Sequence, residues 1–513
     1  EVSQLFPTLA TPQIGGLITP SDMRAEPWVA VPALAGIAAR EGVQIIENCA
    51  VRALDIAAGR IAGVISEQGR IKSSQVVLAG GAWSALFLRN HGISMPQLSV
   101  RENVAATEPL PDVYAGAVSD GRVAFRRRED GGMKTAATEM LDIEFPIFAF
   151  SHCRDVVAAV SKAGGLGVLG AVAHSPEQLE IDLEWIENEV GGKPYGVDLI
   201  VPAKYAGDGD GGYTLDDIAA LIPDTHREFV ADILDRYDVP DLPDDDSTRG
   251  NVPATGAGGS APFSAKQAMP LLDIALAHDT AFVVNALGPP PQFLIDRCKE
   301  EGKLVGALAG RPQHAERHQA AGVDIIIAQG SEAGGHTGEI GSMVLIPEIV
   351  DAVEIPVLGA GGIGRGRQMA AAMALGAQGV WCGSVWLTTD EAETHPIVKQ
   401  KFLAATSADT IRSRSLTGKH ARMLKSKWTE EWERVDTPEP LGMPLQPILT
   451  NTAQKRIARA AFTPGSGAEE LSNYFVGQIV GTMNQPKSAA SVVLEMIEEF
   501  IDAVESLSGQ LQT

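Results

Sequence analysis

Eight short apolar runs rich in β-branched residues follow one another from about residue 141, and stretches with amphipathic helical spacing separate them. Strands that are apolar on both faces and alternate with helices are typical of a parallel sheet that helices cover on both sides. Eight such units predict a closed (β/α)8 TIM barrel, with a doubly wound open sheet as the alternative. The runs span residues 143–150, 166–171, 195–202, 281–288, 304–310, 323–330, 355–364 and 379–387.

The predicted barrel occupies residues 133–390, and it has one long interruption and a long tail. Residues 203–265, between the third and fourth runs, are acidic and rich in Gly and Pro. A connection of this length is either a working lid or a solvated insertion. Residues 391–513 form a C-terminal helical extension that ends in "SAASVVLEMIEEFIDAVESL". The apolar spacing of this stretch predicts a helix that packs on the barrel or on a second subunit of a homo-oligomer.

The first 132 residues have a different sequence pattern from the predicted barrel. They contain a helical stretch, short strands joined by "AGR" and "EQGR" turns, and the strand "QVVLAGGAWS", which together predict a partial α+β module. Met133 is followed by a lysine, as at a start of translation, so we expect the chain to join two genes or pieces of two genes. Residue 1 is Glu, so we expect a processed or truncated N-terminus.

Composition limits the partners and the compartment. The chain has 513 residues, a formal net charge of −24 and a pI of about 4.8, which disfavours nucleic acid and anionic membranes as partners. None of its four cysteines stands in a CxxC pair, so the sequence predicts no metal site and indicates a reducing cytoplasm. No apolar run reaches the roughly 18 residues that a membrane span needs. We therefore expect a cytoplasmic protein with small-molecule ligands.

The stretch "AQGSEAGGHTG" at residues 328–338 directly follows the sixth apolar run. Loops after the strands of a barrel form the face on which ligands bind. Glycines let the backbone approach a flat ligand closely. His336 would then stand over that ligand as a general base, because an imidazole titrates near neutral pH. The alternative is a glycine-rich turn with a solvent-facing histidine.

Two further glycine-rich loops follow the seventh and eighth runs: "LGAGGIGRG" at 358–366 and "WCGSVW" at 381–386. In barrels this pair of loops commonly binds phosphate. We expect the backbone N–H groups of Gly361, Gly362 and Ile363 to face phosphate oxygens. Those of Gly383 and Ser384, with the Ser384 hydroxyl, would face them from the other side. A helix that begins near Gly364 would add its positive N-terminal end; each loop alone could be only a tight turn.

A phosphate at these two loops and a base at the sixth strand describe a mononucleotide whose ring lies across the strand ends, and FMN fits this description. Residues 141 to about 390, with "AQGSEAGGHTG", "GAGGIG" and "CGS" in this order, resemble the nitronate monooxygenase (2-nitropropane dioxygenase) family. The resemblance implies an FMN-bearing barrel in which His336 takes the α-proton of a nitroalkane or lies beside a bound nitronate. The reduced flavin then passes electrons to O2.

The resemblance also implies a set of cofactor-binding residues. Gln329 and Gly330 match the position along the flavin. The chain departs from the family after the first strand, where His152 and Cys153 replace a small turn, and after the third strand, where Asp198 stands in place of an asparagine. The predicted set is Gln329, Gly330, Gly335, Gly361, Gly362, Ile363, Gly383, Ser384, Phe148, Ala149 and Asp198. His152 is either a polar group of the pocket or a helix-terminal residue without a chemical role.

Two other functions stay open on the sequence alone. The "EAGGH" loop also occurs in FMN-dependent enoyl-acyl-carrier-protein reductases and NADH:quinone reductases, so a reductase that uses NAD(P)H is one alternative. A non-catalytic flavin-binding fusion product is the other.

The N-terminal module has a resemblance of its own. "ENCAVRALDI", "GRIAGVISEQGRI" and "VVLAGGAWS" resemble the middle of FAD-dependent oxidoreductases of the glycine-oxidase and D-amino-acid-oxidase type. The GxGxxG turn that binds the pyrophosphate in such folds is absent from residues 1–132. We therefore expect this module not to bind FAD.

Overall fold

The computed structural model describes residues 133–510 except 173, 202–217, 243–264 and 287. It also describes residues 27–46, 49–57, 59–79, 84–91, 93, 117–119 and 124–126. The chain divides into two compact units, Glu1–Glu129 and Asp130–Thr513, which we treat separately.

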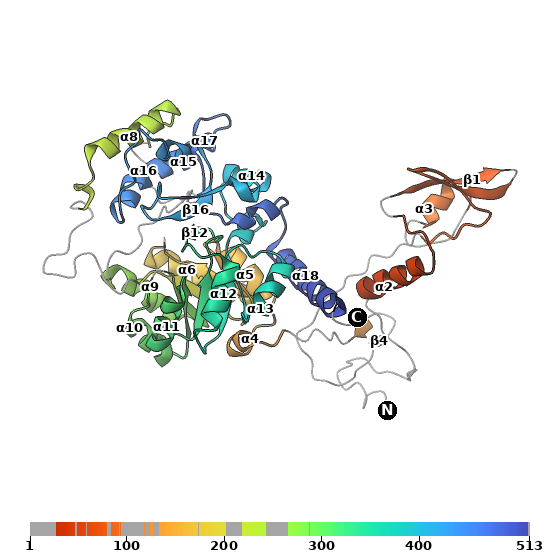
Figure 1. The fold of residues 1–513 in the computed structure, drawn as a ribbon, viewed down its shortest axis with the longest axis horizontal. Helices are drawn as coiled ribbons and strands as arrows, with labels where there is room; N and C mark the ends of the chain where they lie inside the picture. Colours follow the sequence, from red (N-terminus) through yellow and green to blue (C-terminus); the bar gives the residue numbers. More distant parts are fainter. Residues whose placement is uncertain are drawn as a thin grey trace. The chain divides into compact units, whose positions relative to one another are not determined.

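The second unit contains a closed barrel of eight parallel strands (Figure 1). Each strand coincides with one of the eight predicted runs, and only β6 extends beyond its run, by one residue. The predicted TIM barrel is therefore confirmed, and the open sheet is wrong. The strand order around the barrel is β10-β11-β13-β14-β6-β7-β8-β9. The strands are β6 (Ile147–Ser151), β7 (Leu166–Gly170), β8 (Tyr195–Leu199), β9 (Phe282–Asn285), β10 (Leu304–Ala309), β11 (Ile325–Gln329), β13 (Val357–Ala360) and β14 (Gly379–Cys382).

Helices connect the strands and cover the barrel. Helix α6 shows why they begin and end where they do: the Ser175 side chain accepts a hydrogen bond from the Gln178 N–H at its start, and Gly191 ends it with φ 62°. The helices of the barrel are α4 (Ala136–Leu141), α5 (Arg154–Lys162), α6 (Pro176–Val190), α9 (Ala265–Ala277), α10 (Gln292–Glu300), α11 (Pro312–Ala321), α12 (Ser342–Val350) and α13 (Gly366–Ala374).

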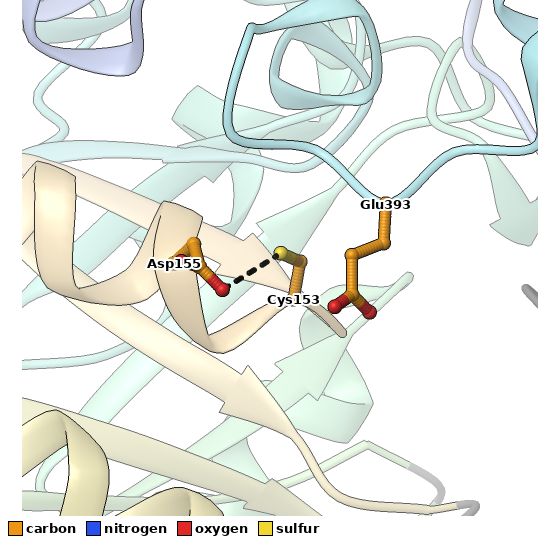
Figure 2. A group of neighbouring side chains, drawn as sticks. All are labelled: Cys153, Asp155 and Glu393. Carbon is orange, nitrogen blue, oxygen red and sulfur yellow. Dashed lines mark hydrogen bonds between the residues drawn. The ribbon is translucent and has the colours of Figure 1, made fainter. Parts of the chain in front are cut away.

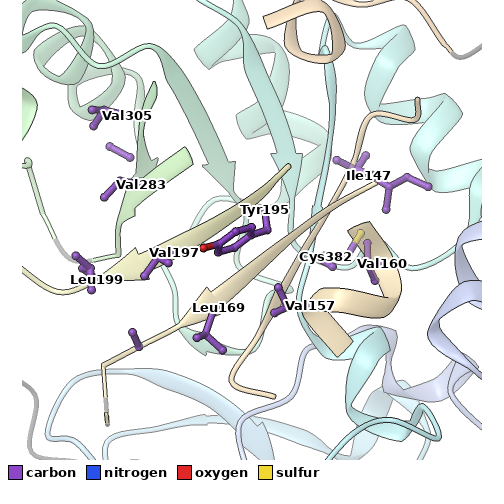
Figure 3. Packing of buried hydrophobic residues seen from close by; sticks show 14 of the residues in the cluster. Ile147, Val157, Val160, Leu169, Tyr195, Val197, Leu199, Val283, Val305 and Cys382 are labelled. Atoms are coloured by element: carbon purple, nitrogen blue, oxygen red, sulfur yellow. The ribbon is translucent and has the colours of Figure 1, made fainter. Parts of the chain in front are cut away.

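Alternation along β8 determines which side chains enter the barrel. Tyr195, Val197 and Leu199 pack among the residues between strands and helices (Figure 3). Because successive side chains of a strand point to opposite faces, Gly196 and Asp198 face the barrel interior. A Cβ on Gly196 would lie 2.7 Å from the Phe282 carbonyl oxygen, so this position has no room for a side chain. The interior is filled by another cluster, in which Phe148 and Phe282 pack edge to face.

The C-terminal extension and the described part of the insertion together form a second hydrophobic core. Helix α8 (Asp224–Arg236) packs there, and the two guanidinium N–H groups of Arg236 each lie 2.8 Å from a carboxylate oxygen of Glu431. This part of the predicted insertion 203–265 therefore belongs to a folded core; residues 203–217 and 243–264 lie outside the described residues. The extension contributes α14 (Pro396–Ala404), β15 (Thr410–Ser413), β16 (Ala421–Leu424), α15 (Lys427–Trp432), α16 (Leu445–Ala460) and α17 (Ala468–Leu471).

The helix predicted at the C-terminus is confirmed as α18 (Ala489–Gln510), which packs against α13 and α5. The contact with α13 is close, since a Cβ on Gly366 would lie 2.0 Å from the Met496 carbonyl oxygen. Glu499 accepts hydrogen bonds from the Arg365 side chain and from the Gly366 N–H. The extension is thereby fixed to the barrel at the helix that follows β13.

The first unit contains a three-stranded antiparallel sheet of β1 (Val51–Ala57), β2 (Arg60–Ser66) and β3 (Gly69–Lys72). Gly59 and Gly69 have φ 76° and 117°, and they stand in the "AGR" and "EQGR" turns that the sequence predicted. The unit also has α2 (Pro27–Arg40), α3 (Ser84–Arg89), β4 (Ala117–Ser119) and β5 (Ala124–Arg126). Across the residues described in both units, no helix is long and apolar enough to cross a membrane.

Candidate active site

The carboxyl ends of the eight strands gather on one face of the barrel, and inward-pointing polar side chains mark its mouth. Ile325 and Ile327 of β11 lie in the interior cluster, so Gln329 at the end of that strand also points inward. Asp198 takes the corresponding inward place on β8. Neither side chain makes a hydrogen bond with another described residue.

The loop after β11 is held by the C-terminal extension. Gly335 and His336 form the short strand β12, which pairs antiparallel with β16, and His336 lies opposite Ala421. Gly334 has no room for a side chain, because an added Cβ would lie 2.9 Å from the Gly477 nitrogen. Gly335 has φ 76° with open space around it. Gly334 thus allows close packing, and Gly335 allows a left-handed backbone conformation beside an open space.

His336 is a neutral imidazole at physiological pH. Burial, with a smaller contribution from the nearby charge of Lys419, lowers its pKa to about 4. Its Nε2 lies 2.8 Å from the Thr417 hydroxyl. The alternative of a solvent-facing histidine is therefore wrong. A neutral ring has one nitrogen lone pair, which a proton acceptor requires.

The loops after β13 and β14 present a row of unpaired backbone donors. Within the described part of the chain, the N–H groups of Gly361, Gly362, Ile363, Gly383 and Ser384 donate no hydrogen bond. Gly361 and Gly362 have φ 97° and 69°, a backbone that glycine adopts readily. The Ser384 hydroxyl accepts from the Gly477 N–H at 2.8 Å and still has its own hydrogen to donate. Such a row fits a phosphate group.

The sequence predicted that the helix after β13 would offer its positive N-terminal end to a phosphate. This prediction is wrong. The helix begins at Gly366, close to the predicted start, but the Gly366 N–H donates to Glu499 of α18 at 3.0 Å. The Gly364 and Arg365 N–H groups donate to the Gln368 side chain at 3.0 and 3.1 Å. A carboxylate and an amide therefore already occupy the positive end of this helix.

Asp198 and His152 lie on either side of the end of β7. Asp198 pairs in register with Gly170, and His152 Nδ1 lies 2.7 Å from the Gly170 carbonyl oxygen. Burial raises the pKa of Asp198 well above its usual range. Burial therefore disfavours the charged form of Asp198. Helix α5 begins after His152, whose ring packs on Phe150, so His152 belongs to the mouth and does not cap the helix.

Residues 134–499 match the nitronate monooxygenase family. The chain belongs to this family. Residues 1–168 match the FAD dependent oxidoreductase family, although residues 147–151 and 166–170 of that range are barrel strands here. The barrel and the family together make the protein an oxidoreductase.

The names of two individual relatives agree with this family assignment. A Mycobacterium tuberculosis protein named "Putative monooxygenase Rv1533" is 60% identical over 381 residues, which are 74% of this chain and 100% of that protein. A "Probable nitronate monooxygenase" of Staphylococcus saprophyticus is 31% identical, covering 64% of this chain and 88% of its own.

Solved structures share the barrel and its extension. Nitroalkane oxidase from Streptomyces ansochromogenes has a TM-score of 0.59 and 26% identity, covering 73% of this chain and 100% of its own. FabK from Thermotoga maritima has a TM-score of 0.54 and 25% identity, covering 74% of this chain and 99% of its own.

The structure does not bring Phe148 and Ala149 to the mouth of this nitronate monooxygenase-family barrel. Phe148 is fully buried in the interior, and Ala149 is fully buried on the side that faces the helices. Phe150, two residues after Phe148 on the same face of β6, lies nearer the mouth. It stacks on Trp381 with centroids 6.0 Å apart and contacts His152 edge to face. Strand alternation alone could have identified Phe150.

One cluster outside the predicted set has side chains that metals bind. Figure 2 shows Cys153, Asp155 and Glu393, whose potential ligand atoms lie within 4.8 Å of one another. The Cys153 thiol already lies 3.1 Å from the Glu391 carbonyl oxygen, to which it donates. Burial raises its pKa, so at neutral pH it is a thiol and not the thiolate that metals bind. We assign no metal to this cluster.

We predict that Asp198→Asn stabilises the fold at neutral pH. The folded-state pKa of Asp198 is raised, so the unfolded chain loses this proton at a lower pH than the folded chain, and the wild type loses stability as pH rises above about 4. Asparagine has nearly the same shape without the charge. Urea unfolding should show the variant more stable than wild type at pH 7.5, and the difference should shrink toward pH 4. Equal stability at both pH values would show that the carboxyl ionises freely.

Proposed function

We propose that the protein is an FMN-dependent nitronate monooxygenase, which oxidises alkyl nitronates or nitroalkanes with O2 to carbonyl compounds and nitrite. The observation that carries the proposal is the combination of a neutral, half-buried imidazole at the end of β11 with a row of unpaired N–H groups at the ends of β13 and β14. A phosphate-bearing ligand bound to that row would have its ring beside the imidazole.

The residues divide into a phosphate site and a ring site. The backbone of Gly361, Gly362, Ile363, Gly383 and Ser384 would hold the FMN phosphate. Gln329, Gly330 and Gly335 would lie along the ring, with Asp198 at the opposite wall of the mouth. When bound, FMN supplies the electron transfer between substrate and O2, for which protein side chains have no group.

His336 would handle the proton. With a neutral nitroalkane, the Cα–H bond breaks and its proton passes to the imidazole lone pair. With a preformed nitronate no proton has to be removed, and His336 would then only position the substrate. The burial that makes His336 a weak base in the free protein also excludes water from the transfer.

Anaerobic mixing tests this function. The purified protein is mixed with propyl-2-nitronate and, separately, with NADH and NADPH, while the flavin absorbance is followed. Bleaching by the nitronate alone is the expected result. Bleaching by a nicotinamide alone would assign the protein to the reductases that share the "EAGGH" loop, and a colourless protein would contradict the phosphate-site argument.

Identifying the released flavin adds a second test. We expect FMN at one equivalent and no FAD, because residues 1–132 contain no GxGxxG turn for a pyrophosphate. One equivalent of FAD beside FMN would show that the first unit is a second flavin site.

A further inference from the structure

The hydroxyl of Thr417 connects the candidate base to the C-terminal extension. Thr417 lies in the turn between β15 and β16 and is 3% exposed. Its Oγ1 lies 2.8 Å from His336 Nε2 and 3.2 Å from the Lys419 carbonyl oxygen. The contact therefore joins the loop after β11 to a residue 81 positions later in the chain.

The partners of this hydroxyl determine the direction of each hydrogen bond. A threonine hydroxyl has one hydrogen to donate, and it can also accept. The Lys419 carbonyl can only accept, and no other described residue donates to it. One arrangement satisfies all three groups at once: Thr417 donates its hydrogen to Lys419, and Oγ1 accepts from His336. A neutral imidazole that donates from Nε2 has its lone pair on Nδ1.

The surroundings of the ring agree with this assignment. His336 Nδ1 makes no hydrogen bond with a described residue and is not among the fully buried atoms without a partner. The lone pair then lies on the ring nitrogen that no described residue occupies.

We propose that Thr417 is a positioning residue that holds His336 in the Nε2–H tautomer, so that Nδ1 accepts the substrate proton. The inference rests on the proposed role of His336 as the base. The extension then completes the active site, because the barrel alone does not contain the group that orients the imidazole.

Four proteins test the proposal: wild type, Thr417→Val, Thr417→Ser and Thr280→Val. Valine removes the hydroxyl at nearly constant shape, and serine keeps it. Thr280 is a matched control, because this residue is 2% exposed and its hydroxyl donates to the Ala275 carbonyl. It stands before β9, at the opposite end of the barrel from the mouth. The rate of flavin reduction by a neutral nitroalkane should fall about 10- to 100-fold in Thr417→Val, as for a misplaced catalytic group. KM should change little, and the serine and control variants should stay within about 3-fold of wild type.

A measurement of the His336 tautomer tests this proposal independently of the proposed function. The chain has ten histidines, and two-bond 15N–1H correlation on histidine-labelled protein, with His336→Asn to assign the signal, reports which ring nitrogen carries the proton. The Nε2–H form in wild type and a mixture in Thr417→Val is the expected result. The Nδ1–H form in wild type, or equal rates for the valine and serine variants, would overturn the proposal. If wild type does not react with nitroalkanes, the proposed function fails, and the spectrum still decides the tautomer.

Discussion

Replacing His336 with asparagine should lower the rate of oxidation of a neutral nitroalkane by about 100-fold or more, because the variant lacks the proposed proton acceptor. The same variant should lose much less with a preformed nitronate, which has no α-proton to remove. The ratio of the two rates therefore separates a base from a residue that only binds. The measurement is flavin reduction under anaerobic conditions with each substrate at saturation.

The control for this variant is His420→Asn. His420 is exposed and lies in the turn that contains Thr417, so the same substitution is made nearby without touching the mouth. It should leave both rates within about 2-fold of wild type, since a surface substitution away from special features has little effect. Equal losses of His336→Asn with nitroalkane and nitronate would contradict the role as base.

The pH dependence follows from the same group. The pKa of His336 is lowered to about 4, so the ring is a neutral acceptor throughout the physiological range. The rate with a nitroalkane should therefore show no protonation of His336 between pH 6 and 8 and should fall only as pH approaches 4. A rise in rate centred near pH 6.5, the ordinary histidine value, would mean that the ring is hydrated.

The barrel was predictable because its signal is local. Each strand is a short run that is apolar on both faces, and "IIIAQG" at 325–330 or "VLGAGG" at 357–362 shows this without its neighbours. The glycine-rich loops after β13 and β14 were predictable for the same reason, since the glycines stand directly after the strands that position them. Asp198 and Gln329 followed from the family resemblance, and strand alternation then places both inside the mouth.

The parts that the sequence did not predict depend on distant partners. Strand β12 has only two residues, so it shows no periodicity, and its partner β16 begins at Ala421. Glu499 reaches the start of α13 from a position 133 residues later, which no local pattern around "GAGGIG" contains. Thr417 touches His336 only because the extension folds back over the barrel. In each case tertiary packing decides the environment of a residue that the sequence singled out.

Replacing Gly383 with aspartate should weaken FMN binding by about 100-fold or more while the protein still folds. Gly383 has φ −113°, which any residue adopts, and an added Cβ would meet only a Phe150 ring carbon at 3.6 Å. The new carboxylate would enter the space in front of the unpaired N–H groups. Two like charges about 5 Å apart repel by about 3 kcal/mol at an effective dielectric constant of 20, which corresponds to this loss.

Two comparison variants show whether charge or size causes the loss. Gly383→Ala adds a side chain without charge and should weaken binding only a few-fold. Gly442→Asp adds the same carboxylate at an exposed glycine with open space, and binding should not change. Titration of the apoprotein with FMN gives the affinities, and thermal unfolding without FMN checks the fold. Glu499 already neutralises the N-terminal end of α13, so the row of N–H groups must supply most of the attraction for phosphate. A Gly383→Asp protein that binds FMN normally would therefore place the phosphate elsewhere on the barrel.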